Sequence, residues 1–127
     1  MSEKVMLQSI VSILERTLPD TWESVVFYAE YPEDAFSIEY YAKTQNGSSY
    51  VKCFDIPGIS RSNLLNDFIE IDKVIAPERD ALSPSKRWNA MTLVLQSDGK
   101  FRIDYDYSDV SSLAYSRKKE WKARYLT

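Results

Sequence analysis

The spacing of apolar side chains predicts a helix at the start of the chain, followed by strands. Residues 3–18 place apolar side chains three and four residues apart: Met6, Leu7, Ile10, Val11, Ile13, Leu14 and Leu18. This spacing is typical of an amphipathic helix. Pro19-Asp20 ends it, because proline cannot continue a helix. Residues 22–31 are rich in valine and aromatic side chains, and apolar and polar residues alternate from Phe36 to Lys43, so both segments are predicted strands.

A third strand is expected from Ser49 to Asp55, with short turns at residues 31–34 and 45–48. Three consecutive strands joined by short turns form an antiparallel meander. Cys53 lies inside this third strand, and a small buried core residue is the expected role of such a cysteine.

A second helix is predicted to begin near Ser60 or Ser62. Its apolar stripe consists of Leu64, Leu65, Phe68, Ile71, Val74 and Ile75. Pro77 is expected to end or restart this helix, because an interior proline loses a hydrogen bond and clashes with the preceding turn. A loop rich in serine and proline follows at residues 82–87.

The last third of the chain predicts a hairpin and a short helix. Residues 90–96 and 101–107 are strands around Ser97-Asp98-Gly99-Lys100, a strong hairpin signal. The second strand of this hairpin alternates cleanly, with Phe101, Ile103, Tyr105 and Tyr107 on one face and Arg102, Asp104 and Asp106 on the other. In a helix near residues 113–125, Trp121 and Tyr125 share one face.

The predicted element order is α-β-β-β-α-β-β-α. Strands follow one another without βαβ alternation, which favours an α+β fold. We therefore expect one domain over residues 1–127, with a single antiparallel sheet of about five strands and helices packed mainly on one face.

Composition excludes several classes of protein. The 127 residues are 44% apolar and 28% charged, which is ordinary for a globular domain. With no histidine, the commonest general base and most zinc sites are excluded. With one cysteine, no intrachain disulfide is possible, and the scattered glycines form no phosphate-binding loop. No cofactor and no metal are therefore expected. No membrane span or signal peptide is apparent, which predicts the cytoplasm.

Acidic residues gather in the first two thirds of the chain. Residues 1–80 carry 14 acidic and 7 basic side chains, whereas residues 81–127 carry 5 and 9. From Asp20 to Glu39 there are six acids and no base: Asp20, Glu23, Glu30, Glu33, Asp34 and Glu39. Such a run either forms a solvated surface or steers a basic partner.

Two clusters suggest other chemistry. Asp104 and Asp106 share a strand face about 7 Å apart, and with Asp109 they suggest a small metal-dependent hydrolase. Solvated strand faces also carry such charges. The C-terminal run Arg117-Lys118-Lys119-Glu120-Trp121-Lys122-Ala123-Arg124-Tyr125 interleaves bases with aromatic residues, which suggests a nucleic-acid-binding regulator. An acidic protein is atypical of that class. Trp121 and Tyr125, four residues apart, are more simply explained as the packed face of a terminal helix.

Several segments, in order, resemble the YezG-like family of antitoxin or immunity proteins. They are Leu18-Pro19-Asp20-Thr21-Trp22-Glu23, Phe27-Tyr28-Ala29-Glu30, Asp55-Ile56-Pro57, Trp88, the run from Ser97 to Tyr107, and Trp121-Lys122-Ala123-Arg124-Tyr125-Leu126. Together they span nearly the whole chain.

The resemblance implies a cytoplasmic protein that binds and neutralises the C-terminal domain of a cognate toxin. Such toxins are usually nucleases delivered by a secretion or contact-dependent system. It implies no enzyme, no direct contact with nucleic acid and no membrane. An acidic surface complements the basic surface of a nuclease. We therefore hypothesise that part of one acidic set binds the toxin: Glu30, Glu33, Asp34, Glu39, Asp104, Asp106 and Asp109.

Overall fold

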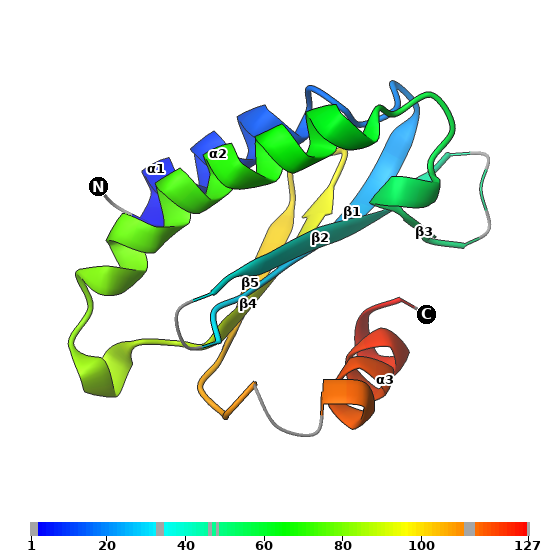
Figure 1. The fold of residues 1–127 in the computed structure, drawn as a ribbon. Coiled ribbons are helices and arrows are strands. Elements are labelled where there is room, and N and C mark those ends of the chain that lie inside the picture. Colours follow the sequence, from blue (N-terminus) through cyan, green and yellow to red (C-terminus); the bar gives the residue numbers. More distant parts are fainter. Residues whose placement is uncertain (1–2, 33–34, 46, 48, 111–113, 127) are drawn as a thin grey trace.

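The computed structural model describes residues 3–32, 35–45, 47, 49–110 and 114–126 (Figure 1). The helices are α1 (Glu3–Leu14), α2 (Arg61–Asp80) and α3 (Ala114–Tyr125). The strands are β1 (Trp22–Glu30), β2 (Ser37–Thr44), β3 (Val51–Lys52), β4 (Ala90–Gln96) and β5 (Phe101–Asp106). Two 3-10 turns, η1 (Cys53–Asp55) and η2 (Pro84–Lys86), complete these elements. The predicted order of helices and strands is confirmed.

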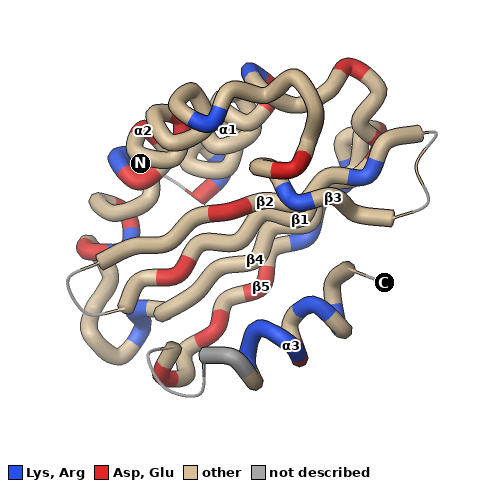
Figure 2. The backbone as a smooth tube through the Cα atoms, turned by 45° about the vertical axis from the view of Figure 1, so that its right-hand side comes forward, with Lys and Arg blue, Asp and Glu red and all other residues tan. Residues whose placement is uncertain are grey.

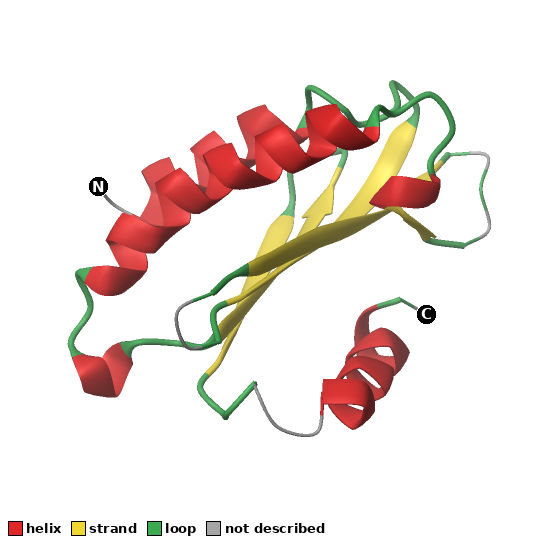
Figure 3. Cartoon of the chain, viewed as in Figure 1, coloured by secondary structure: helices red, strands yellow, loops and turns green. Residues whose placement is uncertain are grey.

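The strands form one antiparallel sheet in the order β3-β2-β1-β4-β5. Helices α1 and α2 lie side by side on one face of this sheet, and α3 lies on the opposite face (Figures 1 and 3). The prediction that the helices pack mainly on one face is confirmed for α1 and α2. The third helix gives the sheet a second, separately covered surface.

The hydrophobic core fills the space between the sheet and the pair α1 and α2. Successive strand residues point to opposite faces, so Val25, Phe27 and Ala29 of β1 all turn toward these helices. They meet Ile10 of α1 and Ile71 of α2, both fully buried. The two-residue period of the strands and the 3.6-residue period of the helices therefore converge on one core.

Helix α2 begins as predicted and ends later than predicted. The Ser60 hydroxyl accepts a hydrogen bond from the Asn63 N–H and caps its start. The prediction that Pro77 ends or restarts the helix is wrong, because the helix continues through Pro77 to Asp80. Only the last turn follows the proline, and Arg79 fixes that turn by donating from Nε to the Trp88 carbonyl at 2.6 Å.

The third strand is much shorter than the predicted Ser49–Asp55 segment. Only Val51 and Lys52 pair with β2, and the chain then coils into η1. The coil buries Cys53 completely and brings the Phe54 ring to 6.1 Å from Phe68 of α2. Core packing therefore overrides strand pairing here. The expectation that Cys53 is a buried core residue is confirmed.

The connecting segments follow the predictions in part. The hairpin between β4 and β5 is confirmed, and Gly99 has the positive φ, 94°, that its turn requires. The predicted loop at residues 82–87 contains η2. The turns at 31–34 and 45–48 include residues 33, 34, 46 and 48, which lie outside the described residues. Within the described chain, every helix is too short or too polar to cross a membrane.

Candidate partner-binding face

Strand register gathers four of the predicted site residues on the sheet face that α3 covers. Glu30 on β1 pairs with Ala90 on β4, and Ala90 pairs in turn with Asp106 on β5. Glu39 on β2 is aligned in the same way, through Tyr28 and Thr92, with Asp104. We call this surface, carrying Glu30, Glu39, Asp104 and Asp106, the acidic face.

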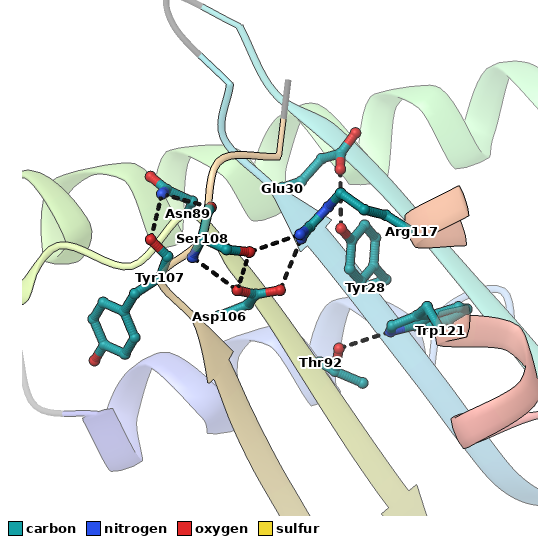
Figure 4. A network of polar contacts seen from close by, with 9 residues as sticks. All are labelled: Tyr28, Glu30, Asn89, Thr92, Asp106, Tyr107, Ser108, Arg117 and Trp121. Carbon is teal, nitrogen blue, oxygen red and sulfur yellow. Dashed lines mark hydrogen bonds and ion pairs between the residues drawn. The ribbon is translucent and has the colours of Figure 1, made fainter. Parts of the chain in front are cut away.

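Helix α3 carries basic residues along its length and lies over strands that carry acidic residues (Figure 2). Its side chains contact three of the four carboxylates, and Figure 4 shows the pair of Arg117 with Asp106. The Arg117 guanidinium lies 2.7 Å from an Asp106 oxygen, and the Lys118 ammonium forms an ion pair with Glu39. The Tyr125 hydroxyl donates to Asp104 at 2.7 Å. Such charge-assisted contacts are stronger than neutral ones. A basic helix therefore covers the acidic face.

Three aromatic rings surround the Lys118 ammonium. Its Nζ lies 5.1 Å from the Tyr28 ring centre, 5.0 Å from Trp121 and 5.9 Å from Tyr41. The Glu39 side chain, only 12% exposed, provides the negative charge beside the rings. Aromatic faces and a carboxylate together form a site for a cationic group.

Trp121 holds the middle of α3 against the sheet. Its Nε1 donates to the Thr92 hydroxyl at 2.9 Å, and its ring lies 5.0 Å from Tyr28 in an edge-to-face arrangement (Figure 4). The Tyr41 ring lies 5.6 Å away. The expectation that Trp121 and Tyr125 pack toward the protein is confirmed. Both side chains remain half-buried rather than fully buried.

A cleft of about 1070 Å³ separates parts of α3 from the sheet. Its lining mixes charged and aromatic groups, among them Tyr28, Asp104 and Arg117. The cleft shows that this helix does not pack against the sheet as closely as α1 and α2 do.

Hydrogen bonds also set the protonation of Asp106. Burial raises the pKa of this carboxyl, but hydrogen bonds from Ser108 and the Arg117 guanidinium outweigh that effect. Its pKa therefore lies below its usual value. The Ser108 hydroxyl and backbone N–H both donate to Asp106, and Arg117 also contacts the Ser108 hydroxyl (Figure 4). Asp106 is thus held as a carboxylate at neutral pH.

Three predicted site residues remain. Asp109 is exposed, beyond the end of β5. Glu33 and Asp34 are outside the described residues. Among the described residues, the structure therefore brings Glu30, Glu39, Asp104 and Asp106 to one face of the sheet, and Asp109 follows the end of β5.

The alternative metal site receives no support from the geometry. In the described segments, no group of three or more His, Cys, Asp or Glu side chains is placed to hold a metal ion. Asp104 instead contacts Arg102 and Tyr125, and Asp106 contacts Arg117.

Sequence reasoning missed the roles of Arg117 and Lys118, which were treated only as part of a basic run. A signal was present, since Lys118 lies three residues before Trp121 and seven before Tyr125. These positions share one face of a helix. The partners on the sheet were not predictable, because they depend on strand order.

The fold and this face define a small α+β domain in which the chain's own basic helix covers an acidic, aromatic face of the sheet. Residues 4–127 match the sequence profile of the family described as immunity protein YezG-like. The chain belongs to this family. It is 29% identical over 122 residues to immunity protein YezG of Bacillus spizizenii strain W23, covering 90% of this chain and 75% of that protein. It is 26% identical over 130 residues to immunity protein YezG of Bacillus subtilis strain 168, covering 95% and 85%.

Proposed function

We propose that this chain binds a cognate toxin domain, a nuclease, and neutralises it by direct contact without catalysis. Membership of an immunity protein family supports the immunity role. The observation that carries the proposal is the acidic face, where four carboxylates project from one sheet. A nuclease needs a basic surface for its polyanionic substrate, so an acidic protein complements it and competes with nucleic acid.

The seven acidic residues are proposed to act in two ways. Glu30, Glu39, Asp104 and Asp106 are fixed by the sheet and form the close contacts. Glu33, Asp34 and Asp109 are proposed at the periphery. Close charge pairs across an interface mainly change dissociation, whereas peripheral charges mainly change the rate of association.

The proposed setting is the cytoplasm, where an incoming nuclease meets nucleic acid. The partner is the C-terminal domain of a toxin delivered by a contact-dependent or secretion system. The natural candidate is a toxin encoded beside the gene for this chain. No cofactor or metal takes part in the proposed neutralisation.

Co-expression in bacteria tests this function. The toxin domain encoded beside the gene should arrest growth when expressed alone, and co-expression of this chain should restore growth. Continued arrest, with the protein present and folded, would reject the pairing.

Binding kinetics across a salt series test the residues. Lysine at both Glu33 and Asp34 should slow association, most strongly at low salt, and Asp104→Lys or Asp106→Lys should speed dissociation. Glu15→Lys is the matched control, because Glu15 is exposed and directly follows α1, in the layer on the other side of the sheet. If all these reversals behave like Glu15→Lys in folded protein, the acidic residues do not contact the toxin.

The alternative of a metal-dependent hydrolase has its own test. Purified protein should release no product from nucleotide or phosphodiester substrates with Mg²⁺, Mn²⁺ or Zn²⁺. Turnover that disappears in the Asp104→Asn, Asp106→Asn double variant would overturn the non-catalytic proposal.

A further inference from the structure

We propose that the toxin binds the acidic face itself and displaces α3, which covers that face in the free protein with the same chemistry that the toxin supplies. This inference rests on the proposed function, since it names the surface on which neutralisation occurs. It concerns where the toxin binds and what must move.

The contacts of α3 indicate what the acidic face recognises. Asp106 receives a guanidinium, and Glu39 receives an ammonium surrounded by rings. Thr92 accepts a hydrogen bond from an indole N–H. A cation pair beside an aromatic side chain therefore matches the surface. The occupant we propose is a segment of the toxin that carries adjacent lysine or arginine residues and an aromatic residue.

Helix α3 is held less firmly than the other two helices. Five residues of α1 and four of α2 are buried, whereas no side chain from Ser116 to Tyr125 is buried. The cleft of about 1070 Å³ leaves part of the interface open. Elements with few buried apolar contacts are those that detach at low cost. The sheet, α1 and α2 share a core to which α3 contributes nothing among its described side chains.

A buried hydroxyl on the acidic face lacks a partner while α3 is docked. Tyr41 is 5% exposed, and its hydroxyl has no hydrogen-bond partner in the described part of the chain. Its ring projects from β2 and lies 5.6 Å from the Trp121 ring of α3. A buried polar group without a hydrogen bond is costly. The contact with α3 is thus incomplete, and a toxin side chain that bonds this hydroxyl would gain what α3 does not provide.

If a toxin cation replaces Lys118 beside Glu39, displacement of α3 has a low electrostatic cost. Glu39 pairs with two cations, Lys118 and Lys52, and the Lys52 Nζ lies 3.2 Å from a Glu39 oxygen. Removing Lys118 alone would break one of these two ion pairs at a largely buried carboxylate, which is unfavourable. A toxin cation that enters as Lys118 leaves keeps the charge paired. A neutral toxin segment would displace Lys118 without supplying a new cation for Glu39. The toxin segment must therefore be basic.

Affinity measurements on α3 variants test the proposal, with the inactivated toxin domain encoded beside the gene as the probe. Trp121→Ala and Lys118→Ala each weaken the docking of α3. If α3 competes with the toxin, the apparent affinity for the toxin domain should rise in both variants. The state in which α3 is detached and the acidic face is free to bind becomes more populated. For Trp121→Ala the Kd is expected to decrease by up to about 30-fold, because the change removes two aromatic contacts and the hydrogen bond to Thr92.

Lys119→Ala is the matched control for Lys118→Ala. Both changes remove one positive charge from the same helix, but Lys119 is exposed and Lys118 lies among the rings. The Kd should fall further for Lys118→Ala than for Lys119→Ala. Equal changes would mean that only the overall charge matters, and would overturn the inference.

Hydrogen exchange on the wild-type complex gives a second, independent result. Toxin binding should reduce the protection of the α3 amides while the amides of β1 and β4 stay protected. Increased α3 protection, or weaker binding by Trp121→Ala, would show that α3 belongs to the toxin interface and would overturn the inference alone. If wild-type protein does not bind the toxin domain at all, the proposed function fails, and this inference fails with it.

Discussion

Replacing Trp121 by alanine tests how α3 is attached. The change removes the contacts with Tyr28 at 5.0 Å and Tyr41 at 5.6 Å, each worth about 0.5–1.5 kcal/mol. It also removes the hydrogen bond to Thr92, worth about 0.5–1.5 kcal/mol. The ring is partly buried. The loss of stability is limited to the free energy that holds α3 on the sheet, because the rest of the domain stays folded when α3 detaches. We therefore expect the free energy of unfolding to fall by about 2 kcal/mol.

Trp88→Ala provides the comparison. Trp88 is 4% exposed and packs against Tyr31 and Tyr105 within the main core. Its replacement should cost about 3–5 kcal/mol, as for other buried aromatic side chains. Urea denaturation followed by circular dichroism measures both variants. If Trp121→Ala cost as much as Trp88→Ala, α3 would be part of the main core. If its cost were below about 0.3 kcal/mol, a value typical of surface changes, the ring would not hold the helix.

Three further predictions concern single groups. The pKa of Asp106 is lowered in the folded protein, so its pairing with Arg117 stabilises α3 docking above about pH 4 and is lost as the pH falls through the folded pKa. NMR titration should show this pKa returning toward its usual value in Arg117→Gln. Burial raises the pKa of the Cys53 thiol, so native protein at pH 8 should not react with a thiol reagent, and urea-unfolded protein should. Gly99→Ala should lower the free energy of unfolding by about 1–2 kcal/mol in the same urea assay, because φ at this turn is 94°; an unchanged midpoint would contradict the strain.

Alternation in the sequence predicted which strand residues share a face. In β5 it separated Asp104 and Asp106 from Ile103 and Tyr105, and the structure places the first pair under α3 and the second toward the core. This success has a simple cause. The two-residue period of a strand is a local property, so it can be recognised in the sequence without knowing what the strand packs against.

Contacts between distant elements were not predictable in the same way. The pairing of Lys118 with Glu39 joins α3 to β2, and depends on β1 lying between β2 and β4. The early end of β3 at Lys52 depends on a contact between Phe54 and Phe68. The local pattern of apolar and polar residues does not indicate either of these contacts between distant elements. A charge run in the sequence therefore predicted an acidic surface, but could not show that the chain's own basic helix covers it.

The most direct test of the proposed function is inhibition of the toxin nuclease by purified protein. The toxin domain encoded beside the gene is incubated with a nucleic acid substrate while this chain is added in increasing amounts. The account predicts that cleavage falls to background as the protein approaches stoichiometric amounts, with no metal or cofactor added beyond what the nuclease needs. Undiminished cleavage in the presence of excess folded protein would contradict it.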